Sequence, residues 1–397
     1  ADACAAAVIA FVGPNANAIR QMCSKALARR IAREHGVACV PGYDGDDTSP
    51  ERLEAEAEAI GFPVMIKASA GGGGRGIRIV AEPGELAKAI DAAKREARGA
   101  FGDDRLIVER YVREPRHLEV QVLGDRDGNV VHLFERECSV QRRHQKLVEE
   151  APAPRLSDAQ RADLHAAALR LARAIGYDNA GTVEFVFDDE AGEAYFLEMN
   201  TRLQVEHPVT ELVTGRDLVA LQLRVAAGEP LPIAQADVTC TGSAVEVRVN
   251  AEDPAKKFLP RTGRIDALRW PTPDEAPGLR VDAGVRSGSE ITPYYDSMIA
   301  KVVAHGATRD EAIARLVGAL DATVCFGPTN NLGFLRQVVD SAPFRAGALT
   351  THFLERHFPN GMAPAPELPL PAHAIAALVL ASEAERDAAG APGSPWQ

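Results

Sequence analysis

A lysine followed by a run of glycines constrains the fold of this chain more than any other stretch. Residues 62–67 form an apolar run that ends in Lys67, and a second, largely apolar run at 77–80 follows the glycines of 71–76. This pattern predicts a β-hairpin with a glycine-rich loop. Because glycine adopts positive φ and has no Cβ, such a loop can bring backbone N–H groups close to phosphate oxygens, while Lys67 and Arg75 supply positive charge.

Two familiar phosphate-binding motifs do not fit this stretch. Gly71, Gly73 and Gly76 match the spacing G-x-G-x-x-G, but that motif requires a helix to follow, and a strand-like segment follows here. The sequence G-x-x-x-x-G-K-[ST] of P-loop proteins does not occur. A mobile turn without a ligand is the structural alternative, so the interpretation depends on residues farther along the chain.

Composition and charge limit the classes of partner. The chain has 397 residues, of which 46% are hydrophobic and 25% charged, which is typical of a globular protein with two or three domains. Its net charge of -12 argues against nucleic acid as the main partner. The six cysteines lack the spacing of a zinc site, and we expect reduced thiols in a cytosol-like compartment. No apolar run reaches the roughly 18 residues of a membrane helix, so we expect a soluble protein without a membrane partner.

Strand-like and helix-like patterns alternate along the chain and predict a protein of the α/β or α+β class. Near the start we expect a buried strand at residues 8–12, one helix that ends at Gly36, and a short strand at 37–40. Residues 41–111 begin with a polar turn and contain two helical and three strand patterns, which predict a compact α+β lid. A proline-rich linker and an alanine-rich helix are expected within 361–397.

Two acidic residues are predicted to face each other on neighbouring strands. Residues 182–187 and 194–199 flank a turn, and pairing of Glu184 with Glu198 places Asn200 on the same face. Opposed carboxylates repel each other unless a cation lies between them, and oxygen-only ligands suit Mg²⁺, which could bridge phosphates. Two alternatives remain open, namely glutamates on a solvated sheet face and the paired acids of a glycosidase.

Polar residues continue the alternation beyond this pair. If residues 198–206 form an extended strand, Arg202, Gln204 and Glu206 lie on the same side as the carboxylates. An arginine can hold a small anion through two hydrogen bonds, and a neighbouring glutamate can accept a proton from it. The segment is therefore a candidate site for activating a small anion.

Basic residues occur at two further places where an anion could bind. Arg248 shares a strand face with Glu246 and Asn250, although a strand arginine can also be a surface residue. The run Gln-Arg-Arg-His-Gln-Lys at 141–146 stands out in an acidic chain, although such runs are usually solvated. His117 is a weaker candidate, because an isolated histidine is more often structural than functional.

Together these segments resemble the biotin carboxylases, which are ATP-grasp enzymes. The resemblance spans about residues 8–360 and is carried by these motifs: Ile66-Lys67-Ala-Ser with the glycines of 71–76, Arg116-His117-Leu-Glu-Val-Gln, Gln141-Arg-Arg-His-Gln-Lys146, Glu149-Glu-Ala-Pro-Ala-Pro154, Glu198-Met-Asn-Thr-Arg-Leu-Gln-Val-Glu-His-Pro208 and Tyr294-Tyr-Asp-Ser-Met298. The C-terminal linker and helix resemble those of biotin-containing α subunits of acyl-CoA carboxylases, of the methylcrotonyl-CoA or propionyl-CoA type.

The resemblance implies an ATP-grasp fold with a mobile glycine-rich lid, whose N-terminal Rossmann-like region is largely missing from this chain. Residues 1–40 would be the remnant of that region, and residues 41–111 the lid domain. Residues 112–360 would form the ATP-grasp and biotin carboxylase C-terminal domain. Residues 361–397 would lead toward a biotin-carrier region outside the chain.

The resemblance also assigns roles to residues at matching positions. The ATP contacts fall on Lys25, Lys67, Gly71, Gly72, Gly73, Gly74, Gly76, Glu109, Arg110, Val112, His117, Gln141, His144, Glu184 and Glu198. The metal ligands fall on Glu184, Glu198 and Asn200. The bicarbonate and biotin site falls on Lys146, Arg202, Gln204, Val205, Glu206 and Arg248. Arg110 stands where a lysine is expected, which keeps the charge but changes the hydrogen-bond geometry near the adenine.

The activity that the resemblance implies is the carboxylation of biotin with bicarbonate and ATP, with Mg²⁺ or Mn²⁺ as the metal and carboxyphosphate as the intermediate. Glu206 would deprotonate bicarbonate, Arg202 and Lys146 would hold the anion, and Arg248 would stabilise the biotin enolate. The implied partners are a biotin-carrier domain and a carboxyltransferase subunit in an oligomeric assembly, in the cytoplasm or, in a eukaryote, in the mitochondrial matrix. Two rivals remain: another ATP-grasp ligase, and a catalytically silent fragment for nucleotide binding or assembly.

Overall fold

The computed structural model describes residues 1–70, 77–143, 145–272 and 274–362. Residues 1–361 form one compact unit, and of the second unit, which starts at residue 362, only that residue is described. The glycine loop, His144 and the C-terminal linker and helix that the sequence predicts therefore lie outside the described residues.

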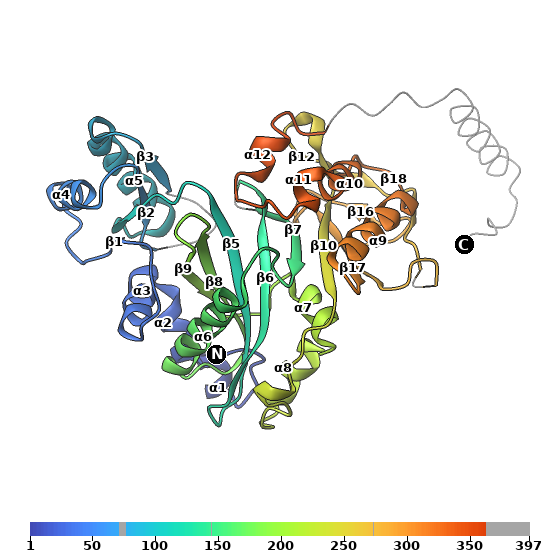
Figure 1. Ribbon diagram of the computed structural model, residues 1–397, viewed down its shortest axis with the longest axis horizontal. Helices are drawn as coiled ribbons and strands as arrows, with labels where there is room; N and C mark the ends of the chain where they lie inside the picture. Colours follow the sequence, from blue (N-terminus) through green and yellow to red (C-terminus); the bar gives the residue numbers. More distant parts are fainter. Residues whose placement is uncertain (71–76, 144, 273, 363–397) are drawn as a thin grey trace, which may run out of the picture. The chain divides into compact units, whose positions relative to one another are not determined.

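An eight-stranded antiparallel sheet forms the centre of the first unit (Figure 1). The strands lie in the order β15-β17-β10-β7-β6-β5-β8-β9. Their bounds are β5 (Pro115–Gly124), β6 (Val130–Arg142), β7 (Gln145–Ala151), β8 (Asn179–Asp188), β9 (Glu193–Asn200), β10 (Ser243–Asn250), β15 (Leu279–Ala283) and β17 (Met298–Gly306). This order places β7 and β10 side by side, although about 100 residues separate them in the chain.

A smaller sheet forms the predicted lid. Its strands are antiparallel in the order β1-β4-β2-β3, and helices α4 and α5 pack on it. The bounds are β1 (Gly42–Tyr43), α4 (Pro50–Ile60), β2 (Val64–Ala68), β3 (Arg78–Val80), α5 (Leu86–Phe101) and β4 (Leu106–Arg110). The predicted hairpin of β2 and β3 is confirmed, and the structure adds β1 where we expected a polar turn.

The predicted strand at residues 8–12 is wrong. The segment follows the short helix α1 (Asp2–Ala6) and contains no strand, and Val8 and Ile9 are 94% and 62% exposed. An apolar run becomes a strand only where a neighbouring strand pairs with its backbone, and no described strand lies against this one. Its apolar side chains therefore remain on the surface.

The predicted N-terminal helix is in fact two helices, α2 (Ala16–Cys23) and α3 (Lys25–Glu34). Ser24 separates them, because its backbone is extended and its hydroxyl accepts a hydrogen bond from the Leu27 backbone N–H, which caps α3. The predicted strand at 37–40 is reduced to a single bridge between Cys39 and Phe196.

The chain after β9 is not the extended strand that we predicted. β9 ends at Asn200, and helix α7 (His207–Thr214) begins directly after Glu206. Pro208 explains the difference, because its fixed φ suits the first turn of a helix and its nitrogen has no N–H to donate to a sheet. Arg202 and Glu206 thus lie on a loop and at a helix start.

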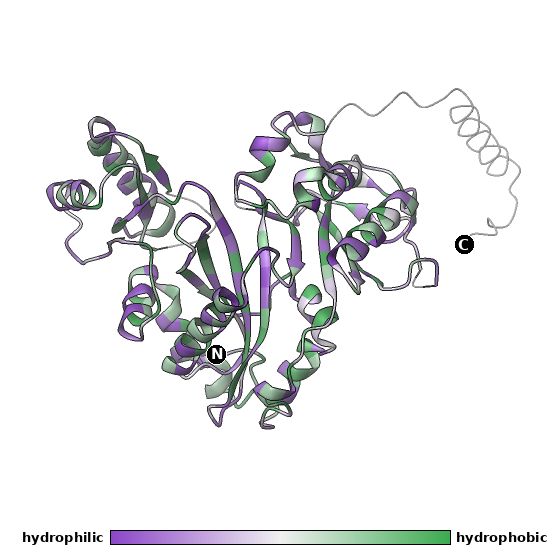
Figure 2. Ribbon diagram, in the orientation of Figure 1, coloured by the Kyte–Doolittle hydropathy of each residue, from purple (hydrophilic) through white to green (hydrophobic). Residues whose placement is uncertain are grey.

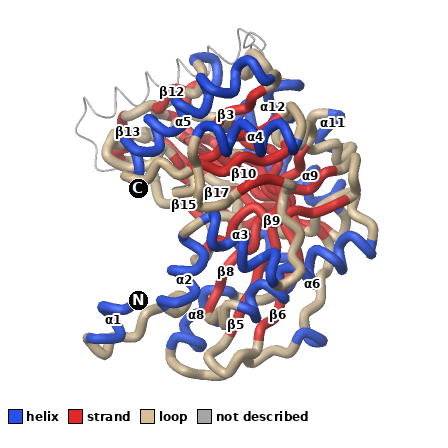
Figure 3. Tube along the Cα trace, turned by 90° about the vertical axis from the view of Figure 1, so that its left-hand side faces the viewer, coloured by secondary structure: helices blue, strands red, loops and turns tan. Residues whose placement is uncertain are grey.

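Helices cover the central sheet. α6 (Asp158–Ala174) begins at a capping box of Ser157 and Gln160. It packs on β5 and β6, as Figure 3 also shows. α7 packs on β6, β7, β10 and β17, and α9 (Arg309–Ala322) packs on β10 and β17. Figure 2 shows hydrophilic and hydrophobic residues alternating along the central strands, so each strand has an apolar and a polar side.

The remaining elements are short. The neighbouring strands β13 and β14 pair with different partners, β16 and β18. The bounds are α8 (Leu218–Ala226), β11 (Glu252–Asp253), β12 (Leu259–Pro260), β13 (Gly263–Arg264), β14 (Ala267–Arg269), β16 (Glu290–Ile291), β18 (Val324–Phe326), α10 (Leu332–Asp340), α11 (Ala342–Arg345) and α12 (Phe353–His357). Three 3₁₀ turns lie at Pro83–Glu85, Gln235–Asp237 and Pro254–Lys256. Within the described residues, no helix has the length and apolarity of a membrane span.

Candidate active site

A cavity of about 820 Å³ is lined by the small sheet, helix α3 and the polar side of the central sheet. The structure brings these predicted site residues together around it: Lys25, Lys67, Glu109, His117, Gln141, Lys146, Glu184, Glu198, Asn200, Arg202, Gln204, Val205, Glu206 and Arg248. Two described residues of the predicted set do not line it, because Arg110 donates to the hydroxyl of Tyr195 and Val112 is buried beside Val40.

Lys146 on β7 joins three carboxylates in this cavity. Its Nζ lies 2.5 Å from Oε2 of Glu119, 3.0 Å from Oε1 of Glu184 and 2.6 Å from Oε1 of Glu206. Burial lowers the pKa of Lys146, but Glu119 and Glu184 outweigh it and raise the pKa well above its ordinary value. The ammonium group is therefore fixed as a cation, and it connects β5, β8 and the start of α7.

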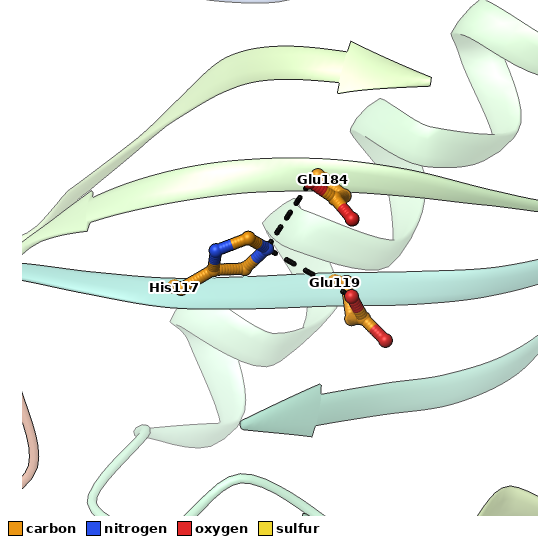
Figure 4. A group of neighbouring side chains, drawn as sticks. All are labelled: His117, Glu119 and Glu184. Atoms are coloured by element: carbon orange, nitrogen blue, oxygen red, sulfur yellow. Dashed lines mark ion pairs between the residues drawn. The ribbon is translucent and has the colours of Figure 1, made fainter. Parts of the chain in front are cut away.

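His117 and Glu119 on β5 and Glu184 on β8 point toward one another (Figure 4). Nε2 of His117 lies 3.2 Å from Oε2 of Glu184 and 3.8 Å from Oε2 of Glu119. Burial alone would raise the pKa of Glu119, but Lys146 and Arg136 lower it to about 2. Lys146 contacts both carboxylates, so these three residues are part of one ion-pair network.

The predicted carboxylate pair is confirmed at the level of strand register. Glu184 lies opposite Glu198, and Thr182 lies opposite Asn200. Nδ2 of Asn200 donates to Oε1 of Glu184 over 2.8 Å, which leaves the amide oxygen of Asn200 available as a ligand. The Glu198 side chain is 34% exposed, and Nζ of Lys25 lies 3.9 Å away. An oxygen-only donor set of two carboxylates and one amide fits Mg²⁺.

Glu206 lies between two cations. Its Oε1 accepts from Lys146, and its Oε2 lies 2.9 Å from Nη2 of Arg248 on β10. Glu206 is only 2% exposed, and its side chain makes no capping hydrogen bond to α7, although it occupies the cap position. A small anion that enters the cavity can contact the same two cations next to a carboxylate that can accept its proton.

Arg202 and Gln204 have different surroundings. Arg202 is exposed at the cavity, and its Nη1 donates to the carbonyl oxygen of Leu203. Gln204 is buried, donates through Nε2 to Glu184 over 2.9 Å and accepts from Arg136 over 3.2 Å. The predicted common strand face is thus wrong, but the loop after β9 still places both residues on the cavity.

Cations also gather on the side of the cavity formed by the small sheet. Lys67 on β2 pairs with Glu109 on β4, and Glu109 pairs in turn with Arg29 on α3. Arg29 is 3% exposed and also binds Oδ2 of Asp44 at 2.9 Å. Lys25 is half-buried, and burial lowers its pKa despite the opposing effect of Glu198. This group of cations suits the phosphates of a nucleotide.

Several residues of the site were not singled out in the sequence. Glu119 carries a signal that could have found it, because it lies two residues after His117 in a strand and hence on the same face. Arg29, Arg136 and Glu149 give no such signal. Their partners are brought to them only by the assembled sheet and by α3, from positions up to about 100 residues away.

Family models match nearly the whole described chain. Residues 24–234 match the carbamoyl-phosphate synthase L chain ATP-binding domain, and residues 246–356 match the biotin carboxylase C-terminal domain. The biotin carboxylase domain of Hydrogenobacter thermophilus 2-oxoglutarate carboxylase, solved with MgADP, ADP and bicarbonate, is similar with a TM-score of 0.87 and 44% identity, over 92% of this chain and 80% of that chain. Campylobacter jejuni biotin carboxylase gives a TM-score of 0.86 and 42% identity, over 90% and 78%.

Curated relatives point to the same family. The mitochondrial methylcrotonoyl-CoA carboxylase subunit alpha of Arabidopsis thaliana is 48% identical over 357 residues, which are 90% of this chain and 48% of the relative. The mitochondrial propionyl-CoA carboxylase alpha chain of Homo sapiens is 48% identical over 358 residues, which are 90% of this chain and 49% of the relative. The fold is that of the ATP-grasp class. The chain belongs to the biotin carboxylase family, and it spans about half the length of the curated relatives it matches.

Proposed function

We propose that this chain carboxylates biotin with ATP and bicarbonate, as the first half-reaction of an acyl-CoA carboxylase. The observation that carries the proposal is the position of Lys146. One buried ammonium group joins Glu184, which lies in the predicted metal pair, to Glu206, which lies at the anion-binding end of the cavity. The proposed nucleotide end and the proposed bicarbonate end thus meet at Lys146. Transfer of a phosphoryl group to bicarbonate requires that the two reactants lie close together in this way.

Each end of the cavity has its own task. At the nucleotide end, Lys25 and Lys67 would contact phosphate oxygens, and Mg²⁺ held by Glu184, Glu198 and Asn200 would neutralise phosphate charge. At the other end, Lys146 and Arg248 would orient bicarbonate and Glu206 would accept its proton. Arg248 would then stabilise the negative oxygen of the biotin enolate, while Arg202 contacts the anion from the exposed side.

The wider context is proposed from the relatives. Their names describe mitochondrial alpha subunits of acyl-CoA carboxylases. We propose that biotin arrives on a carrier domain, that a carboxyltransferase subunit takes the product, and that a eukaryotic source would place the protein in the mitochondrial matrix. We also propose residues 41–111 as a lid domain that closes over the nucleotide.

An assay of ADP release tests the proposed activity. We expect ATP cleavage that depends on bicarbonate and is stimulated by free biotin, because the proposed intermediate forms before biotin reacts. Cleavage stimulated by an amine, without any effect of biotin, would favour another ATP-grasp ligase. Nucleotide binding without any bicarbonate-dependent cleavage, measured on the full polypeptide that contains this chain, would favour the silent fragment.

Replacement of Glu198 by glutamine is expected to raise the Mg²⁺ concentration needed for half-maximal ATP cleavage by about tenfold or more, because one charged ligand is lost. The fold should be as stable as before, since the repulsion between Glu198 and Glu184 is relieved. Glu193→Gln is the matched control, because Glu193 is exposed on the same strand and lies outside the cavity. If Glu198→Gln turned over ATP as fast as the wild type at low Mg²⁺, the assignment of Glu198 as a metal ligand would be contradicted.

A further inference from the structure

Two buried carboxyl groups face each other under the cavity. Glu149 on β7 lies directly opposite Glu246 on β10 in the antiparallel register. The residues are 1% and 0% exposed. Oε2 of Glu149 and both carboxyl oxygens of Glu246 have no hydrogen-bond partner among the described residues. Two carboxylates that are adjacent, shielded from water and short of hydrogen-bond donors cannot both remain ionised without a large cost in free energy.

Arg248 is the one described cation that contacts this pair. Its Nε donates to Oε1 of Glu149 over 2.6 Å, and its Nη2 lies 2.9 Å from Glu206. On the other side of β10, Glu246 lies opposite Val303, which belongs to an apolar cluster with residues of α7. Among the described residues, no donor on either neighbouring strand makes a hydrogen bond to Glu246.

The other charged groups that face the pair have partners of their own. Lys146 on β7 binds three other carboxylates, and Lys301 on β17 donates to the carbonyl oxygen of Val205 over 2.8 Å. On α7, His207 lies 3.8 Å from Glu211, which also pairs with Arg280. The guanidinium group of Arg248, which also binds Glu206, thus faces both carboxyl groups of the pair.

We propose that Glu149 and Glu246 share a proton, and that this buried acid pair positions Arg248 for the reaction with biotin. The role rests on the proposed function, whereas the shared proton does not. With one proton on the pair, Glu149 is an anion and holds the Nε side of Arg248. With a second proton, Glu149 is neutral, and Glu206 becomes the only anionic partner of Arg248. The protonation state of the pair therefore determines how firmly Glu149 binds Arg248. The firmer this contact, the more the guanidinium group is kept from the biotin oxygen.

The electrostatics agree with this arrangement. Burial raises the pKa of Glu149 to about 7, and Arg248 offsets this only in part. Burial and the neighbouring Glu149 raise the pKa of Glu246 well above its ordinary value. Between pH 4.5 and about 7 the native protein binds protons that the unfolded chain has released. This contribution to stability is complete below pH 4.5 and is lost as the pH rises through about 7.

Infrared spectroscopy tests the shared proton without any turnover. The carbonyl stretch of a protonated carboxyl group is absent from a carboxylate, so the wild type should show a component of this band that titrates near pH 7. In Glu246→Gln, a neutral amide replaces the neutral carboxyl group of Glu246, so the component that titrates near pH 7 should remain, and the part of the band that persists above pH 7 should be lost. In Glu149→Gln, Glu246 still has no donor, so its band should persist through neutral pH without titrating.

Glu150→Gln is the matched control. Glu150 is the next residue on β7, is also buried, and binds Arg309 on the opposite face of the strand. This variant should keep the component that titrates near pH 7. An unchanged band above pH 7 in Glu246→Gln, or a component near pH 7 that remains in Glu149→Gln, would overturn the proposal, whether or not the protein carboxylates biotin.

Kinetics test the positioning of Arg248. In the wild type, kcat/KM for free biotin should follow an ionisation near pH 7, because Arg248 is bound more firmly as Glu149 ionises. In Glu149→Gln this ionisation should be lost, so the KM for biotin should no longer change across pH 7, while the KM for ATP is unchanged. An unaltered pH profile would refute the positioning role, even if the infrared result holds.

Glu246→Leu covers the case in which the glutamine variant does not fold. Leucine fills a similar volume beside Val303 and introduces no polar group, so this variant should fold and should lack the band that persists above pH 7. Its unfolding midpoint in urea should exceed that of the wild type at pH 8, because an apolar side chain replaces a buried carboxyl group that has no hydrogen-bond partner among the described residues. Failure of both variants to fold would show that the Glu246 carboxyl is required for structure, which contradicts the proposal.

Discussion

Glutamine in place of Glu206 should lower the rate of bicarbonate-dependent ATP cleavage by roughly 10²- to 10⁴-fold, the usual contribution of a general base. The amide keeps the size of the side chain and one acceptor oxygen, but it cannot take the proton of bicarbonate. Lys146 and Arg248 keep their other carboxylate partners, so the cations that bind the anion stay in place. The KM for ATP should barely change, since the nucleotide end of the cavity is untouched.

A structural role of Glu206 would give a different result. Glu206 occupies the cap position of α7, but its side chain makes no capping hydrogen bond, so the helix should not depend on the carboxylate. Glu211→Gln is the matched control on α7, because Glu211 binds Arg280 and the Leu218 backbone N–H outside the cavity. If Glu206→Gln lost stability and nucleotide affinity while its folded fraction turned over normally, the assignment as a base would be wrong.

The sequence could predict those parts of the site that depend on neighbouring residues. The glycine-rich hairpin of β2 and β3 follows from two apolar runs, and the register of Glu184 with Glu198 follows from a short turn between two alternating strands. In both cases the residues that interact lie within about 15 positions of each other in the chain.

The alternation of polar residues predicts an extended strand at residues 201–206, and this prediction is wrong. Polar residues at every second position are typical of a strand, but Pro208 favours the first turn of a helix, and this local signal outweighs the alternation. The predicted strand at 8–12 failed for a different reason. Its apolar pattern is strong, but a strand needs a partner, and pairing is a property of the whole fold.

The charge network could not be predicted, because its members come from separate elements. Lys146 meets Glu119 from β5, Glu184 from β8 and Glu206 from the start of α7, and no spacing in the sequence relates them. The facing pair of Glu149 and Glu246 depends on β7 and β10 becoming neighbours across about 100 residues. Such contacts follow only from the strand order of the sheet.

Methionine in place of Lys146 is expected to have the largest effect on stability. The variant keeps a long apolar side chain but leaves three buried carboxylates, Glu119, Glu184 and Glu206, without their shared cation. Removal of one partner from a buried ion pair costs about 3–5 kcal/mol, so the free energy of unfolding at pH 8 should fall by at least this amount. Carboxylation of biotin should be lost as well.

The pH dependence distinguishes this explanation from a simple packing defect. In the wild type, Lys146 helps to lower the pKa of Glu119 to about 2 and that of Glu184 below its ordinary value. Their contribution to stability is present above pH 4.5 and is lost as the pH falls toward 2. In Lys146→Met the same carboxyl groups should bind protons near neutral pH, so the stability lost at pH 8 should be partly regained at pH 5.5. Urea unfolding at both values measures this, with exposed Lys88→Met on α5 as control. A deficit of equal size at both pH values would show that the loss comes from packing and not from unpaired charge.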